Sequence, residues 1–193
     1  DWSAQDAAIR PLARETGVER FWRPLTDLPA TISSAAKRAA TRAVNLAGID
    51  TAEVGSDGAV DMFRARAMAP FRLDLASLRS TLRNAPTEDT VRAGGVGMSL
   101  FLPAPDGTFE RFSIWRSEMM EPGLAARFSS IRTYAGQSLE DPGRSVRFDV
   151  SAQGLRAMAT GGETGTYYID PVYLGDNTLF ASYARADAVA PSW

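Results

Sequence analysis

The sequence contains no cysteine and no histidine. Without these side chains the usual zinc, copper and iron sites cannot be built, and only oxygen ligands suited to magnesium or calcium remain. The same absences exclude Ser-His-Asp triads, Cys-His pairs, CxxC redox motifs and the HExxH motif. A large part of known enzyme chemistry is therefore out of reach, and we expect no cofactor in this chain. Carboxylates, Tyr, Ser/Thr, Arg and one lysine remain as reactive groups.

A strong charge of one sign and a long apolar run are also lacking. The 193 residues include 21 basic and 23 acidic ones, so the net charge is −2 and a basic surface for nucleic acid is not predicted. No apolar stretch approaches the roughly 18 residues that cross a bilayer, and we expect no membrane partner. The sequence starts at Asp1 without a methionine or an apolar leader, which is typical of a mature or trimmed product.

Residues 1–60 hold thirteen alanines, and their pattern predicts an N-terminal arm that is partly helical and partly irregular. We expect a helix over about residues 33–47, because Ser33 or Ser34 can cap its start and Gly48 can stop it. Aromatic residues that precede this helix would dock the arm on the rest of the chain.

Between residues 61 and 185 the pattern becomes α+β. Asp74 is expected to cap a helix that runs through Asn84, and Pro122 to start a short helix that ends at Phe128. Strand-like runs occur at residues 71–73, 96–102, 112–114, 131–134, 146–150, 155–159, 166–169 and 179–183.

The connections between these runs are too short for helical crossovers. We therefore predict an α+β domain with a largely antiparallel β-sheet and a few short helices, followed by a C-terminal linker at residues 186–193. Val146, Phe148 and Val150 alternate with polar residues, which predicts a sheet with one buried and one solvated face.

Two kinds of short motif are better interpreted as local structure than as chemistry. Ser34-Ala35-Ala36-Lys37 matches the S-x-x-K of penicillin-recognising enzymes, but no second lysine exists for their K-T-G element. The glycine-rich stretches 94–97 and 161–166 lack the Gly-Lys-Ser/Thr of a phosphate-binding loop, and they lie between predicted strands. We interpret the first as a capped helix start and the others as turns.

Carboxylates near strand ends could serve glycoside hydrolysis, which needs two acids about 5–10 Å apart. The candidates are Asp141, Asp149, Asp170 and Asp176, with Trp115, Tyr134, Tyr168 and Tyr183 as aromatic platforms. Spacing in the sequence does not show that any two acids converge. Arg132, Arg147 and Arg156 also alternate with apolar residues, which favours a ladder of ion pairs with Asp149 or Asp170 on the solvated face.

From Pro70 to Arg185, about 60% of the chain, an ordered series of segments resembles the pro-domain that precedes reprolysin-like (adamalysin-like) zinc metalloproteases of bacteria. The series comprises Pro70–Asp74, Ala85-Pro86, the turn at Pro105-Asp106-Gly107, Met120–Phe128, Ile131–Gly136, Asp141-Pro142, Arg147–Asp149, Gly154–Met158, Tyr168–Pro171, Gly175-Asp176 and Tyr183–Arg185.

The resemblance implies a non-catalytic part of a secreted or periplasmic precursor, which assists the folding of a zinc protease domain and keeps it latent until cleavage. The partner would then be that protease, in cis or in trans, and the zinc would belong to it. Some relatives silence the zinc with a cysteine, which this chain does not contain. Steric cover, strand addition or a carboxylate would replace it. Candidate inhibitory or interface residues are Asp170, Asp176, Tyr134, Tyr183 and Arg147, and processing is expected near Arg185.

Two other functions stay open at this point. The chain could be a stand-alone extracellular binding module that uses tyrosine and tryptophan on one sheet face. A carboxylate-dependent glycosidase is the third reading.

Overall fold

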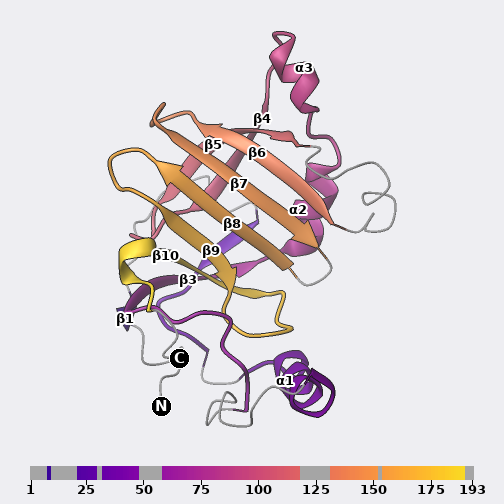
Figure 1. Cartoon of the computed structure of the whole chain (residues 1–193), viewed down its shortest axis with the longest axis vertical. Coiled ribbons are helices and arrows are strands. Elements are labelled where there is room, and N and C mark those ends of the chain that lie inside the picture. Colours follow the sequence, from indigo (N-terminus) through magenta and orange to yellow (C-terminus); the bar gives the residue numbers. More distant parts are fainter. Residues whose placement is uncertain are drawn as a thin grey trace.

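The computed structural model describes residues 8–9, 21–29, 32–47, 58–117, 131–151 and 154–189, and a β-sheet dominates it (Figure 1). Its strands are β1 (Ala8–Ile9), β2 (Trp22–Pro24), β3 (Ala67–Leu73), β4 (Met98–Pro103), β5 (Phe109–Arg116), β6 (Arg132–Ser138), β7 (Arg144–Ser151), β8 (Gly154–Gly161), β9 (Tyr167–Pro171) and β10 (Leu179–Ala184). Its helices are α1 (Ser34–Ala47), α2 (Leu75–Leu82), α3 (Glu88–Arg92) and the 3₁₀ turn η3 (Arg185–Asp187).

The strands form one sheet in the order β1-β3-β10-β9-β8-β7-β6-β5-β4, with β2 also paired to β3. Strands β4 to β10 are each paired to the next one along the chain, and all these pairs are antiparallel. Among the pairs of named strands that the structure describes, only β1 and β3 run parallel. The prediction of a largely antiparallel sheet with a few short helices is thus confirmed.

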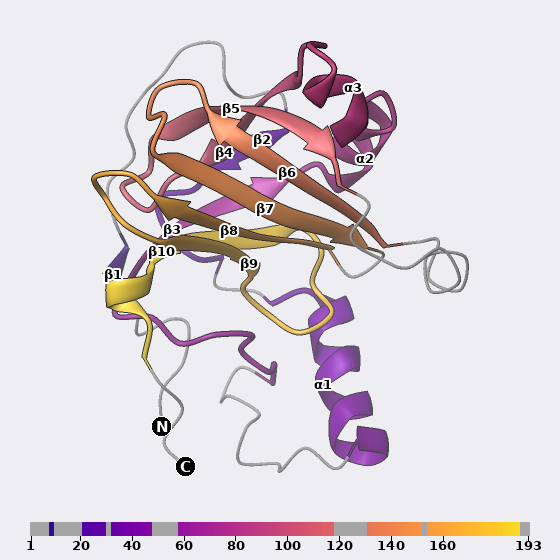
Figure 2. The same ribbon diagram turned by 45° about the horizontal axis from the view of Figure 1, so that its top comes forward.

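The sheet is strongly curved, and its inner face encloses the main core. The rings of Phe71 on β3 and Phe109 on β5 have centroids 5.6 Å apart, although five strands lie between β3 and β5 in the sheet order. This contact requires the two ends of the sheet to approach each other, and the twist is visible in Figure 2. Helix α2 buries Leu75, Leu78 and Leu82 in the same core.

Asp74 caps α2 as the sequence predicts. Its Oδ1 accepts a hydrogen bond from the Ser77 backbone N–H at 3.0 Å. The helix ends at Leu82, two residues before the predicted end at Asn84.

A second, smaller core lies on the outer face of β3 and β10. Ile32, which precedes α1, and Ala36 in its first turn pack there with Met68, Ala181 and other apolar residues. Both figures show α1 beneath the sheet, beside the connection from β9 to β10. Gly175 in that connection has φ +75°, and a Cβ there would overlap the Ala39 side chain, so only glycine allows this close approach.

The described parts of the predicted N-terminal arm pack against the sheet. Trp22 of β2 is completely buried in the main core, in edge-to-face contact with Phe71 and Phe180. The predicted helix at 33–47 is present as α1, from Ser34 to Ala47. The predicted loop from Gly48 to Gly58, except Gly58 itself, and the predicted helix from Pro122 to Phe128 lie outside the described residues.

The predicted C-terminal linker begins inside the folded part of the chain. The Arg66 N–H donates to the Asp187 carbonyl at 2.8 Å, and the Val189 N–H donates to the Arg64 carbonyl at 2.8 Å. Ala65 and Ala188 form a β-bridge between these two bonds. Residues through Val189 therefore belong to the fold, because their backbone groups are paired with another segment.

Candidate functional site

Strand β7 has one buried and one solvated side, as its sequence predicts. Val146, Phe148 and Val150 are each at most 4% exposed, whereas Arg147 is exposed and Asp149 is half-buried. The outer face of the sheet at β7 therefore presents polar side chains, and the register with neighbouring strands decides which groups join them.

The register brings together a charged row and an aromatic row on this outer face. In the charged row, Asp149 on β7 pairs with Arg156 on β8, and Arg156 stands beside Asp170 on β9. The aromatic row is made of Arg147, Met158, Tyr168 and Tyr183, which are successive cross-strand partners on β7, β8, β9 and β10.

Between these rows lies a shallow pocket of about 300 Å³, here called the outer pocket. Ten residues of β6 to β9 line it, among them Arg147, Asp149, Arg156, Met158, Tyr168 and Asp170. The volume is at the lower end of the range of small-ligand sites.

Arg156 lies between the two carboxylates of the charged row. Its Nε is 3.9 Å from Asp170 Oδ1, and its side chain is 53% exposed. Burial raises the pKa of Asp149, the charge of Arg156 lowers that pKa, and the charge of Asp170 raises it again. The two carboxylates thus share one neighbouring guanidinium.

Tyr183 connects the two rows. Its hydroxyl donates a hydrogen bond to Asp170 Oδ2 at 2.8 Å. Burial raises the pKa of Asp170 above its ordinary value, while this hydrogen bond and Arg156 oppose the increase. Burial and the neighbouring Asp170 carboxylate also raise the pKa of Tyr183, so its hydroxyl stays a donor across the ordinary pH range.

The aromatic row leads from the second core into the outer pocket. The Phe63 ring stacks on Tyr183 with centroids 4.2 Å apart, and the Tyr168 ring lies 5.5 Å from Tyr183. Met158, beside Tyr168, is 40% exposed. An exposed thioether next to an aromatic ring offers an adaptable apolar contact.

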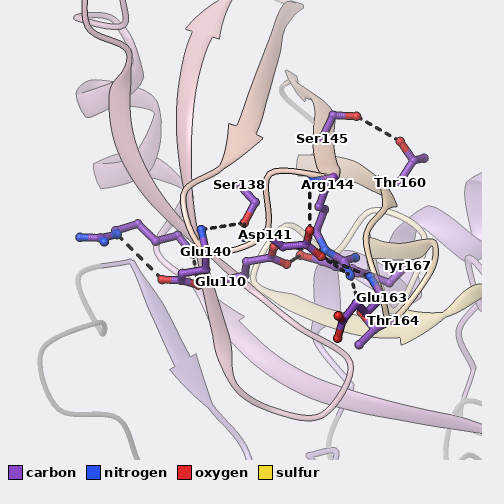
Figure 3. Close-up of polar contacts among 12 residues, drawn as sticks. Glu110, Ser138, Glu140, Asp141, Arg144, Ser145, Thr160, Glu163, Thr164 and Tyr167 are labelled. Atoms are coloured by element: carbon purple, nitrogen blue, oxygen red, sulfur yellow. Dashed lines mark hydrogen bonds and ion pairs between the residues drawn. The ribbon is translucent and has the colours of Figure 1, made fainter.

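A second charged cluster lies at the end of the sheet, where the β6–β7 and β8–β9 turns meet (Figure 3). Arg144 is 3% exposed, and its Nε lies 3.1 Å from Glu110 Oε1, close enough for an ion pair but without the alignment of a hydrogen bond. Its guanidinium also donates to the Gly165 carbonyl and the Thr164 hydroxyl, and it lies over the Tyr167 ring.

Tyr167 and Asp141 complete this cluster. The Tyr167 hydroxyl donates to Glu110 Oε2 at 3.1 Å, and burial together with the Glu110 charge raises the pKa of Tyr167 far above its ordinary value. Asp141 accepts backbone hydrogen bonds from Gly143 at 3.0 Å and Glu163 at 3.3 Å. The cluster therefore holds two turns in place, which confirms that the glycine-rich stretch 161–166 is a turn.

Three of the candidate carboxylates and tyrosines are occupied by contacts within the fold. Tyr134 borders the outer pocket, but its side chain is 3% exposed and its ring stacks on Phe148 in the main core at 4.9 Å, so the prediction of its side chain as an interface group is corrected. Asp176 is 4% exposed and accepts from the Thr178 N–H at 2.8 Å, so it cannot serve as an exposed inhibitory carboxylate. The Asp141 carboxylate is occupied by the backbone hydrogen bonds of its turn.

The remaining candidates come together or lie at the surface. Asp170, Tyr183 and Arg147 belong to the two rows, as does Asp149. Of the predicted ladder of Arg132, Arg147 and Arg156 with these acids, the structure shows the Arg156 part: Arg156 is paired with Asp170 and stands opposite Asp149. Arg185 is exposed in η3, where its N–H donates to the Thr166 carbonyl at 2.9 Å.

Sequence reasoning missed the cluster of Arg144, Glu110 and Tyr167. One signal was present: Arg144 is two residues before Val146, so the alternation of β7 places its side chain on the inner face. A buried arginine needs an acidic partner. The identity of that partner depends on how β5 approaches the β8–β9 turn, which spacing does not reveal.

Comparison with known proteins gives no match to a family model, a curated protein or a solved structure. Among the described residues, no three side chains of the metal-binding types gather into a group that could hold an ion. No helix in that part of the chain is both long and apolar enough to span a membrane.

Proposed function

We propose that this chain is the non-catalytic pro-domain of a secreted or periplasmic precursor, and that it binds a zinc metalloprotease domain and keeps it latent. The outer pocket and the two rows around it would form the contact. The zinc would be held by the protease, and this chain would contribute cover for the active-site cleft and assistance in folding.

One observation carries the proposal. The ten residues that line the outer pocket all belong to four of the segments on which the resemblance rests, namely 131–136, 147–149, 154–158 and 168–171. Segments far apart in the sequence thus converge on one solvated site. Buried positions in them serve the core, but exposed side chains such as Met158 and Arg156 contribute little to folding, which supports a role in binding.

The position of Arg156 favours binding over glycoside hydrolysis. Asp149 and Asp170 stand on β7 and β9 with β8 between them, a strand separation of about 10 Å, which is near the carboxyl spacing of inverting enzymes. Arg156, however, is in the same row between them, where a sugar would have to enter. Both carboxyl pKa values are raised, so the arrangement lacks the contrast between a protonated acid and an ionised base.

The test is inhibition of the protease domain encoded in the same precursor, measured with a fluorogenic peptide substrate. Added at micromolar concentration, the chain should abolish activity and co-elute with the protease on gel filtration. Met158→Glu should weaken inhibition about tenfold or more, because it adds a charge to an apolar contact. Glu163→Gln, an exposed change in the β8–β9 turn, is the matched control.

Unchanged protease activity without complex formation would contradict the proposal. A coding sequence without a zinc peptidase domain after Trp193 would favour a stand-alone binding module instead. Glycan hydrolysis by the purified chain would favour the third function.

We infer that processing falls after Val189 and not at Arg185. The bonds from Arg66 to Asp187 and from Val189 to Arg64 tie this segment to the fold, and a protease needs it extended. Limited trypsin digestion followed by mass spectrometry should therefore leave the Arg185–Ala186 bond intact in the folded chain and cut it after denaturation. An early cut at Arg185 in the folded chain would refute this inference.

A further inference from the structure

Strand β4 is the one long strand with an open edge in the part of the sheet that the structure describes. The sheet order ends at β4, and its one strand partner among the described residues is β5. At the opposite end of the sheet, β1 and β2 border β3 with only two and three residues, and edge strands as short as these offer little to another chain. β4 has six residues, which is long enough to accept a further strand.

The backbone of β5 shows which groups of β4 are directed to this open edge. The Arg111 carbonyl accepts a hydrogen bond from the Leu139 N–H at 2.8 Å, and the Arg111 N–H donates to the Glu140 side chain at 3.3 Å. Arg111 thus uses its backbone on the side away from β4, and its cross-strand partner Phe101 forms a non-hydrogen-bonded pair with it. Because such pairs alternate with hydrogen-bonded ones, Ser99 and Phe101 both direct their N–H and C=O groups outward. No other hydrogen bond engages these groups within the described residues.

The composition of β4 gives this edge little protection against pairing. Its sequence, Met-Ser-Leu-Phe-Leu-Pro, contains no charged residue, whereas natural edge strands are commonly protected by lysine or by inward-pointing charges. Pro103 at its end has no N–H and is buried, so it limits pairing to the residues before it. Ser99 is exposed, Phe101 is half-buried, and Val96 just before the strand is 88% exposed. Residues 98–102 are therefore available to another strand.

An uncharged strand of this kind suits a second copy of itself. A two-fold axis brings identical side chains close together, so a charge in the strand would be repelled by its own copy. With the axis at Leu100, the midpoint of residues 98–102, Ser99 of each copy lies opposite Phe101 of the other. Since both residues direct N–H and C=O outward, the two pairs form four backbone hydrogen bonds, and Pro103 stays outside the ladder.

We propose that two copies of this chain associate through their β4 strands, antiparallel and in register about Leu100, to form one continuous sheet. The contact is a single strand pair and is smaller than a standard interface, so the dimer is weak and forms between micromolar and millimolar concentration. The inference does not rest on the proposed function, because the outer pocket is lined by residues of β6 to β9 and not by β4.

Sedimentation velocity of the full chain, from micromolar to millimolar concentration, measures this association. The wild type should change from monomer to dimer as the concentration rises. Ser99→Lys should raise the dissociation constant of the dimer about tenfold or more, because two lysines then approach each other near the axis. Ser145→Lys is the matched control and should sediment as the wild type does. Ser145 is also exposed and lies in the same cross-strand row as Ser99, but on β7, which is flanked by β6 and β8.

Two mixing experiments separate a lost contact from a lost fold. Ser99→Lys and Ser99→Glu should each be monomeric alone and should form a dimer when mixed, because the charges near the axis are then opposite. The chain contains no cysteine, so introduced thiols report the register without interference. When Ser99→Cys and Phe101→Cys are mixed and oxidised with glutathione disulfide, the mixed disulfide should exceed either symmetric one, because the proposed register pairs these two positions.

The proposal would be overturned by a chain that stays monomeric over the whole range, by equal association of Ser99→Lys and the wild type, or by a preference for a symmetric disulfide. A monomeric chain whose inhibition of the protease is lost in Ser99→Lys but kept in Ser145→Lys would assign the β4 edge to the protease, and would also overturn it. A dimer that does not inhibit the protease would leave this inference standing and would reject the pro-domain role.

Discussion

Arg144 and Arg156 illustrate two different uses of an arginine on neighbouring strands. Arg144 points to the inner face, is 3% exposed, and contacts Glu110, Thr164 and Tyr167. Arg156 points to the outer face, is 53% exposed, and has an ion pair at the long distance of 3.9 Å. The first holds two turns in place, while the second is an exposed neighbour of two carboxylates. At β7 and β8 the inner face thus holds a buried charged cluster, whereas the outer face leaves charged side chains at the surface.

The largest difference in the free energy of unfolding is expected between the variants that remove Arg144 and Arg156. Arg144→Ala leaves Glu110 with an uncompensated charge, and we expect it to lower the free energy of unfolding by about 3–5 kcal/mol. Arg156→Ala removes an exposed pair and should cost below about 1 kcal/mol. Urea denaturation followed by circular dichroism measures both, and equal losses would refute the contrast.

A smaller contrast is expected between two tyrosine hydroxyls. Tyr167→Phe removes the donor to the enclosed Glu110 carboxylate and should cost about 1.5–3 kcal/mol, because the acceptor is charged and shielded from water. Tyr183→Phe removes the donor to Asp170, which water and Arg156 can still reach, and should cost about 1 kcal/mol or less. Thermal unfolding of the two variants in parallel tests which substitution costs more stability. A larger loss for Tyr183→Phe than for Tyr167→Phe would mean that the hydroxyl on the outer face contributes more to stability.

The pH dependence of stability tests the two carboxylates of the outer face. Folding raises the pKa of both Asp149 and Asp170, so above pH 3.8 the folded state binds protons more tightly than the unfolded chain. Their contribution to stability is therefore greatest at low pH and is lost as the pH rises through the raised pKa values. Relative to Asp149→Asn/Asp170→Asn, the wild-type Tm should improve on acidification from pH 7 towards pH 4. If the Tm of the wild type and that of the double variant changed equally with pH, this prediction would be contradicted.

The smallest effect is expected at Met158. Because this side chain is 40% exposed, Met158→Ser should change the free energy of unfolding by no more than about 0.5 kcal/mol. The same substitution should weaken protease binding if the outer pocket is the contact. A large loss of stability would show that Met158 belongs to the core, and would remove the argument that the outer face is kept for a partner.

Local structure could be predicted well from the sequence because it depends on neighbouring residues. The cap at Asp74, the turn at residues 105–107 and the alternation of β7 all follow from side-chain chemistry within a few positions. The position of Trp22 could not be predicted, since its burial depends on the pairing of β2 with β3, some fifty residues away. Tyr134 was misplaced for a similar reason: its face is set by the register with Phe148.

The amino-acid sequence alone excluded the metal sites and catalytic motifs that require histidine or cysteine, because the chain contains neither residue. It also determined a sheet with two unlike faces, since side chains alternate along every strand. Only the tertiary structure decided that Asp149, Arg156 and Asp170 form one row beside Met158 and Tyr168, because strand register joins residues whose distance in sequence carries no information about their contact.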